Sequence, residues 1–194
     1  MSDAPAVRTE LLQLLLDRRS ASGFSDVAPT AAQVELMARA AATSPDHGKL
    51  RPWRLVYVEG EARDRFGDAL VDAGLDRNPE LPDPVRSKLR SKAFVAPAFL
   101  VIVASPRLES KVDVWEQQAT AACAGFGVVL AAEALGLAAV WKSAPFQDGP
   151  MLRRLLSMTE AESMLGWVNV GGHPDDRVQV PRPVEDVSER VTVL

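Results

Sequence analysis

The chain has 194 residues, of which 47% are hydrophobic, and this size and composition suit one compact domain with its own core. The net charge of −4 and a pI near 5.3 argue against general binding to nucleic acids, because polyanion-binding proteins carry a basic surplus. No run reaches the roughly 18 apolar residues of a spanning helix, and no signal-peptide pattern begins the chain, so we expect a cytoplasmic protein without membrane contacts.

The cysteine and histidine content limits the chemistry of the chain. A single cysteine, Cys123, cannot form an internal disulfide, and small residues on both sides predict a buried, inert thiol. The two histidines, His47 and His173, stand far apart without the spacing of zinc ligands. We therefore expect no metal site.

A first helix is predicted to end at Arg18-Arg19-Ser20. Val7, Leu11, Leu14 and Leu15 have helical spacing and would share one buried face. Two adjacent guanidiniums and a hydroxyl suggest an anion site. Cations also stabilise a helix C-terminus through its dipole, so these residues alone leave both interpretations open.

The next segments alternate between helix and strand. Thr30 and Gln33 form a capping-box pattern, which predicts that a second helix starts there and runs to Ser44-Pro45. The further predicted elements are a loop over 46–52, a short buried strand over 55–58, a helix over 61–74 with Phe66, Leu70 and Ala73 inward, an irregular connection over 76–84, and a solvated basic helix over 85–92.

The second half of the chain contains the most apolar segments. The run 98–104 predicts a central strand covered on both faces. A helix over about 114–136 is apolar nearly all round, so it must be buried in the domain or at a subunit interface. Its Gly125-Phe126-Gly127 lacks the dinucleotide fingerprint and indicates close helix packing instead. The remaining predictions are a strand over 138–141, a helix over 150–156, a strand over 165–170, and a tail that wraps a neighbouring chain.

Three segments combine charged or aromatic groups with loops at the ends of regular elements: Arg18-Arg19-Ser20, Ser44-Pro45-Asp46-His47 with Pro52-Trp53, and Trp141-Lys142-Ser143. Asp46 and His47 could pair as an oriented general base, yet no nucleophile motif accompanies them, so a hydrolase triad fits poorly. Trp53, Trp115 and Trp167 lie beside apolar residues, which favours packing in a core or an interface.

Together these segments resemble the nitroreductase family, and its short YdjA-like members in particular. The resemblance covers nearly the whole chain and depends on the order and spacing of several motifs. The motifs are Arg18-Arg19-Ser20-Ala21-Ser22, Ala28-Pro29-Thr30, Ser44-Pro45-Asp46-His47, Pro52-Trp53, Trp115-Glu116-Gln117, Gly136, Trp141-Lys142-Ser143, Gly166 and Val170-Gly171.

The resemblance implies an α+β fold of three layers, with a central, mostly antiparallel sheet flanked by helices, in an intertwined homodimer that holds FMN at the subunit interface. It implies one domain over 1–194 whose C-terminal arm, about 173–194, embraces the partner, with 191–194 as an added strand. The implied activity is that of an NAD(P)H oxidoreductase, in which NADH or NADPH reduces FMN and a nitroaromatic, quinone or similar conjugated acceptor reoxidises it. The flavin carries the hydride, so no catalytic side chain is needed.

The resemblance also suggests which residues bind FMN. Arg18 and Ser20 would clamp the phosphate, Arg19 and Ser20 are candidates for the pyrimidine edge, and His47 would come from the second subunit. Trp141, Lys142 and Ser143 would line the ring and the phosphate side, and Lys142 or an arginine would stabilise the anionic reduced flavin. Arg177 and Arg182 are further candidates for a phosphate contact, between which the sequence does not decide.

Two positions depart from the family pattern. Thr43 stands where similar proteins often have an arginine, so an anion contact there is weakened or passes through water. Lys142 also replaces an arginine and loses the planar, bidentate fork. These departures motivate an alternative in which the chain is a non-catalytic FMN carrier or redox sensor. A third possibility is a scaffold dimer without a ligand.

Overall fold

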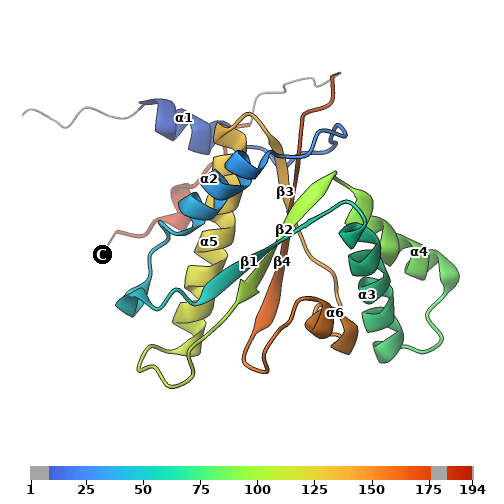
Figure 1. Ribbon diagram of the computed structural model, residues 1–194. Coiled ribbons are helices and arrows are strands. Elements are labelled where there is room, and N and C mark those ends of the chain that lie inside the picture. The colour runs from blue at the N-terminus through green and yellow to red at the C-terminus, as the bar shows by residue number, and fades with distance from the viewer. Residues whose placement is uncertain (1–8, 176–182, 194) are drawn as a thin grey trace, which may run out of the picture.

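Four antiparallel strands form the centre of the molecule in the order β1-β2-β4-β3 (Figure 1). The computed structural model describes residues 9–175 and 183–193. The strands are β1 (Trp53–Glu59), β2 (Ala98–Ala104), β3 (Ala138–Lys142) and β4 (Ser163–Gly171). Every residue of β2 is buried, and β2 pairs with β1 and β4, as predicted for a central strand. β1 is longer and less buried than predicted, because it is an edge strand.

Helices cover both faces of the sheet (Figure 1). On one face α2 (Ala31–Ala41) packs on α5 (Val114–Ala134), and both contribute to a core that contains Met37, Leu100 and Val128. The other face carries a core that contains Phe66, Phe99 and Trp167. Its helices are α3 (Ala62–Arg77), α4 (Asp83–Ser91) and α6 (Pro150–Leu155). The α+β arrangement of an antiparallel sheet between helices is therefore confirmed.

The shorter elements lie at the periphery. α1 (Thr9–Asp17) contacts α5, and three 3₁₀ helices follow in chain order: η1 (His47–Lys49), η2 (Lys92–Phe94) and η3 (Ser188–Arg190). No helix in the described part of the chain is both long and apolar enough to cross a membrane.

Local sequence signals explain several of these elements. The capping box is present: the Gln33 backbone N–H donates to the Thr30 hydroxyl at 3.3 Å, and the Thr30 N–H donates to the Gln33 side chain at 2.9 Å. Phe66 points inward from α3 as predicted and meets Trp167 edge to face at 5.3 Å between ring centroids. Gly125 and Gly127 do serve close packing, since a Cβ at Gly127 would lie 3.3 Å from the Ala41 Cα of α2.

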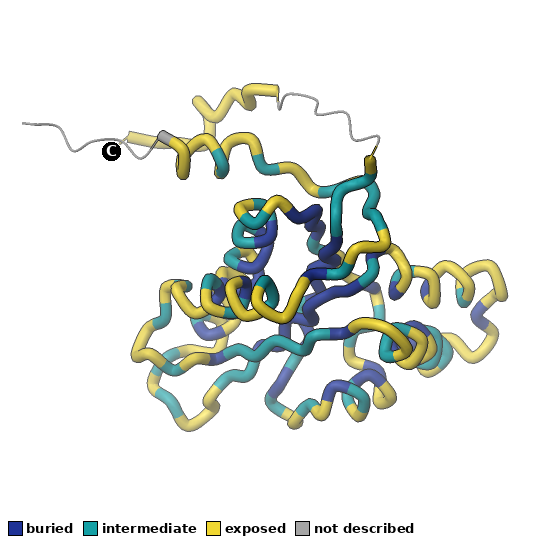
Figure 2. Tube along the Cα trace, turned by 45° about the horizontal axis from the view of Figure 1, so that its top comes forward, coloured by how far each residue is buried: buried dark blue, intermediate teal, exposed yellow. Residues whose placement is uncertain are grey.

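Some burial predictions are wrong for the protomer. Cys123 is exposed, and the side chains of Leu11 and Leu15 are not covered, with exposed fractions of 52% and 38%. Val7 lies outside the described residues. Trp115 is 66% exposed, so it belongs to no core, whereas Trp167 is fully buried. The physical reason is that an apolar pattern predicts that a face is covered, whereas α1 is exposed along most of its length in the protomer (Figure 2).

Candidate functional site

The segment that carries Arg18, Arg19 and Ser20 is attached to the edge strand β3. The helix α1 ends with the Arg18 N–H donating to the Leu14 carbonyl at 3.0 Å, and the Ala21 N–H then donates to the Ala139 carbonyl at 2.9 Å. Because Ala139 lies two residues before Trp141, the backbone brings two of the predicted segments together. Arg18 is half-buried, and Arg19 and Ser20 are exposed.

The end of β3 presents Lys142 on the face of the sheet that carries α3, α4 and α6. Lys142 is paired in register with Trp167, and directly opposed residues of antiparallel strands lie on the same face. Trp167 belongs to the core on that face. Lys142 and Ser143 are exposed, so both side chains are open to a ligand.

Trp141 points to the opposite face, as the alternation of strand side chains requires. Its indole packs with the core of α2 and α5, close to Gly125, and Nε1 donates to the Leu165 carbonyl at 3.3 Å. Within the protomer Trp141 therefore supports the strand that carries Lys142. Its predicted contact with a flavin ring stays a prediction.

Lys92 is a site candidate that sequence reasoning missed. Its ammonium donates to the Ser143 carbonyl at 3.1 Å. Burial lowers the pKa of Lys92, and the nearby charges of Lys142 and Lys88 lower it further. Among the described residues no carboxylate forms an ion pair with Lys92 or Lys142. This corner of the sheet thus carries excess positive charge, which an anionic ligand would balance.

The only sequence signal for Lys92 was its place in the basic stretch 85–92, which was predicted to be solvated. That prediction holds for Lys88, which is exposed, but is wrong for Lys92, which is half-buried. The difference arises because Lys92 lies at the start of η2, beyond the end of α4, and reaches the chain that follows β3.

Thr43 and His47 lie on the other side of the sheet, near α5. Thr43 follows α2, and its hydroxyl donates to the Ala40 carbonyl at 2.7 Å. The imidazole of His47 lies 3.0 Å from the Glu116 carboxylate, measured from Nδ1 to Oε2. The loop is also fixed to α5 by Thr120, whose hydroxyl donates to the Pro45 carbonyl at 2.9 Å.

Asp46 organises this loop and does not pair with His47. Its side chain is 6% exposed and accepts hydrogen bonds from the backbone N–H groups of Leu50, at 3.0 Å, and Arg51, at 2.8 Å. Gly48 has a φ of 76°, the left-handed conformation that glycine adopts without strain. The considered pairing of Asp46 with His47 as a general base is therefore wrong. The carboxylate beside His47 belongs to Glu116, a motif residue to which no role was given.

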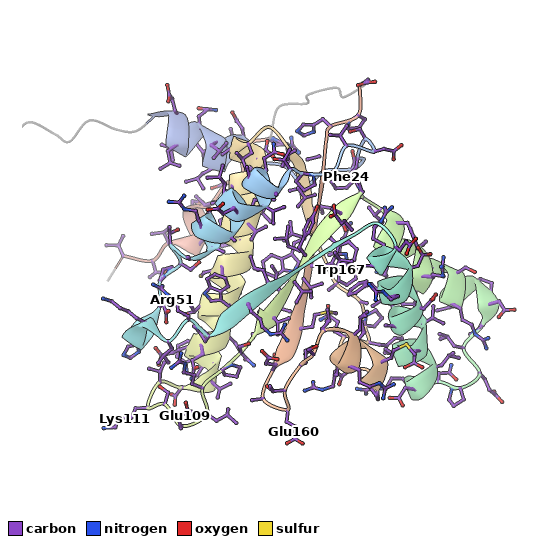
Figure 3. The ribbon with its side chains drawn as sticks, viewed as in Figure 1. Phe24, Arg51, Glu109, Lys111, Glu160 and Trp167 are labelled. Atoms are coloured by element: carbon purple, nitrogen blue, oxygen red, sulfur yellow. The ribbon has the colours of Figure 1, made fainter. Side chains whose placement is uncertain are left out.

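The candidate residues thus come from two places in the fold, the chain around the end of β3 and the loop that follows α2. The first group is defined here as Arg18, Arg19, Ser20, Lys92, Lys142 and Ser143, and the second as Thr43 and His47. Figure 3 shows Arg51, in the loop of the second group, on the α5 side of β1, away from the central Trp167. Arg177 and Arg182 lie outside the described residues.

Comparisons with known proteins agree with this architecture. The family model described as "Nitroreductase family" matches residues 15–172. The chain is 33% identical over 162 residues to the Escherichia coli protein named "Putative NAD(P)H nitroreductase YdjA". The aligned region covers 84% of this chain and 87% of the relative. A Haemophilus influenzae protein named "Putative NAD(P)H nitroreductase" is also 33% identical and covers 84% of this chain and 88% of its own length.

Solved structures show the same fold. A nitroreductase-like family protein from Bacillus cereus superposes with a TM-score of 0.78, covering 98% of this chain and 99% of its own, at 21% identity. A nitroreductase with bound FMN from Bacteroides fragilis has a TM-score of 0.69, covers 95% and 98% of the two chains, and is 19% identical. On the family match and the identity to its relatives, this chain belongs to the nitroreductase family.

Proposed function

We propose that this protein is an FMN-dependent NAD(P)H oxidoreductase that reduces nitroaromatic, quinone or similar conjugated acceptors. The observation that carries the proposal is the positive corner formed by Lys92 and Lys142 beside Ser143. A half-buried ammonium that pairs with no carboxylate of residues 9–175 and 183–193 is costly unless a ligand supplies negative charge. The relatives' names, which contain the words "Putative NAD(P)H nitroreductase", and the FMN-bound structure of the same fold support this choice of ligand.

The residues present fit FMN. Bound FMN supplies hydride transfer at its N5 atom, and its reduced form is an anion that a nearby cation stabilises. Lys92 and Lys142 would hold that negative charge, Arg19 and Ser20 would face the pyrimidine edge, and Arg18 with Ser20 would bind the phosphate. Ser143, whose carbonyl accepts the hydrogen bond from Lys92, would lie beside the ring and the phosphate, and Trp141 supports the end of β3.

We propose that the second group of residues completes the site from a partner subunit. His47 would contact the FMN held by the first group of the other chain, and Thr43 would contribute an uncharged, weaker contact. The partner subunit would also cover the exposed apolar residues of α1 and α5, which include Leu12, Leu16, Trp115 and Phe126.

The C-terminal arm, about 173–194 of a single 1–194 domain, is proposed to embrace the partner. Val191 and Val193 are 69% and 90% exposed, so they find no core in their own protomer. The edge of β3 already receives the Ala21 N–H, whereas β1 pairs only with β2 among the described strands. The free edge of β1 is therefore the proposed place for the partner's tail to add as a strand. We propose that this homodimer functions in the cytoplasm.

An absorption spectrum of the purified protein tests the proposal, followed by heat release and analysis of the chromophore. We expect the bands of oxidised flavin, about one FMN per subunit, and bleaching within seconds when NADH or NADPH is added without oxygen. A quinone or nitroaromatic should then restore the colour. Bound flavin that stays yellow with both nucleotides would favour the carrier or sensor. A colourless protein that takes up no added FMN would overturn the proposal.

A further inference from the structure

The contact between His47 and Glu116 joins two exposed elements that are far apart in the sequence. Nδ1 of His47, in η1, lies 3.0 Å from Oε2 of Glu116, in the first turn of α5. The His47 side chain is 69% exposed and that of Glu116 is 33% exposed. No other hydrogen bond to the His47 ring occurs within residues 9–175 and 183–193, so the outer edge of the imidazole faces solvent.

The chemistry of the two groups fixes the position of a proton. An ionised carboxylate only accepts hydrogen bonds, so Nδ1 must carry the hydrogen of this contact. In a neutral imidazole, Nε2 is then a lone-pair acceptor. A ligand group that meets this edge of His47 must therefore donate a hydrogen bond.

We propose that Glu116 is a positioning residue that holds His47 in the Nδ1–H tautomer, so that Nε2 accepts a hydrogen bond from a hydroxyl group of the ligand. The inference rests on the proposed function, in which that ligand is the FMN held by the partner subunit. Phosphate oxygens and flavin carbonyls carry no hydrogen to donate. The imide N–H of the pyrimidine lies at the edge assigned to Arg19 and Ser20. The ribityl hydroxyls are the remaining donors, so His47 recognises the ribityl chain.

The tautomer can be measured without FMN. Long-range ¹⁵N–¹H NMR distinguishes protonated from unprotonated ring nitrogens, and the chain has only two histidines, so a His173→Gln variant assigns both signals. In the neutral ring, which holds a single hydrogen, we expect that hydrogen on Nδ1 of His47. In Glu116→Gln, whose amide can donate as well as accept, the Nε2–H form should appear. Wild-type protein with the hydrogen on Nε2 would overturn the inference, whatever the variant does.

Flavin binding tests the consequence for the ligand. We expect Glu116→Gln to weaken binding of FMN and riboflavin by about three- to tenfold, the worth of one hydrogen bond. Binding of lumiflavin, which has no ribityl chain, should be unchanged, and the effect should vanish in a His47→Ala background. A loss of the same size for lumiflavin would show a general structural effect and contradict the inference.

A matched control separates the site from the surface charge. Glu35 lies on α2 with an exposed carboxylate, 4.0 Å from Arg39, and Glu35→Gln changes the net charge equally. It should leave the affinity for all three flavins unchanged. If wild-type protein binds no flavin, the proposed function fails, while the NMR result still decides the role of Glu116 toward His47.

Discussion

The indole of Trp141 occupies the space that a side chain on Gly125 would need. An ideal Cβ at Gly125 would lie 2.5 Å from Cζ3 of the ring and 3.2 Å from Cγ1 of Ile102. Gly125→Ala should therefore lower the free energy of unfolding by about 1–3 kcal/mol through overpacking, despite the better helix propensity of alanine. Urea unfolding measures the change.

The ring atoms that would clash are absent from phenylalanine, which provides a rescue. In a Trp141→Phe background, Gly125→Ala should lower the free energy of unfolding by less than it does in the wild type. The difference between the two changes is the coupling energy between the two positions. Equal costs in both backgrounds would show that the indole is not the obstacle.

Glu162 is expected to make the free energy of unfolding depend on pH in the acid range. Its pKa is lowered to about 2, chiefly by the hydrogen bond from Arg54 and further by the hydroxyl of Ser105. Because the folded-state pKa lies below the ordinary value of 4.5, the contribution is complete above that value and is lost as the pH falls toward 2. Glu162→Gln should lower the free energy of unfolding by about 2–3 kcal/mol at pH 7, and this difference should shrink on acidification.

Glu160 provides the control for this measurement, since it lies in the same loop with an exposed side chain (Figure 3). Glu160→Gln should change the free energy of unfolding by less than about 0.5 kcal/mol at every pH. A difference between Glu162→Gln and wild type that stays constant down to acid pH would refute the role given to the ionised carboxylate.

Lys92 is expected to influence flavin binding more than its neighbour Lys88. Lys92→Met should weaken FMN binding by about 10- to 100-fold and lower the reduction potential of the bound flavin, because one stabilising cation is lost. Lys88→Met removes the same charge from an exposed position of α4 and should have little effect on either quantity. Fluorescence titration and a reference-dye potential measure the two. Equal effects of the two variants would show that Lys92 acts only through the net charge of the protein and not through a contact with the flavin.

The thiol of Cys123 reports whether α5 is covered in solution. Cys123 is exposed in the protomer, so a free monomer would react readily with Ellman's reagent. In the proposed homodimer the reaction should be slowed at least about tenfold relative to the unfolded chain. Sedimentation of the same sample gives the mass. A dimer whose thiol reacts as fast as the unfolded chain would mean that subunits associate through another surface.

The order of helices and strands was predictable because each carries a local signal. The apolar run of β2, the inward residues of α3 and the Thr30 cap all depend on residues within a few positions of one another. Such signals arise from backbone geometry and side-chain periodicity, which a sequence displays directly.

The polar contacts were not predictable, because they join residues that are far apart in the sequence. Arg54 and Glu162 are 108 residues apart, and Glu116 reaches His47 across 69. Nothing local marks such pairs, and Lys92 carried only the signal of a basic stretch. The exposure of Leu11 and Cys123 was also not predicted. An apolar pattern predicts that a helix face is covered, but it does not say whether the same chain or another chain covers that face.

The separation of His47 from Lys142 on opposite faces of one sheet has a genetic consequence. If each site takes one residue from each chain, two inactive proteins, one altered at His47 and the other at Lys142, can complement each other. Their mixed dimer has one site with both defects and one site with neither. When the two variants are refolded together, every mixed dimer should therefore have one intact site out of two. Either variant refolded alone should have none.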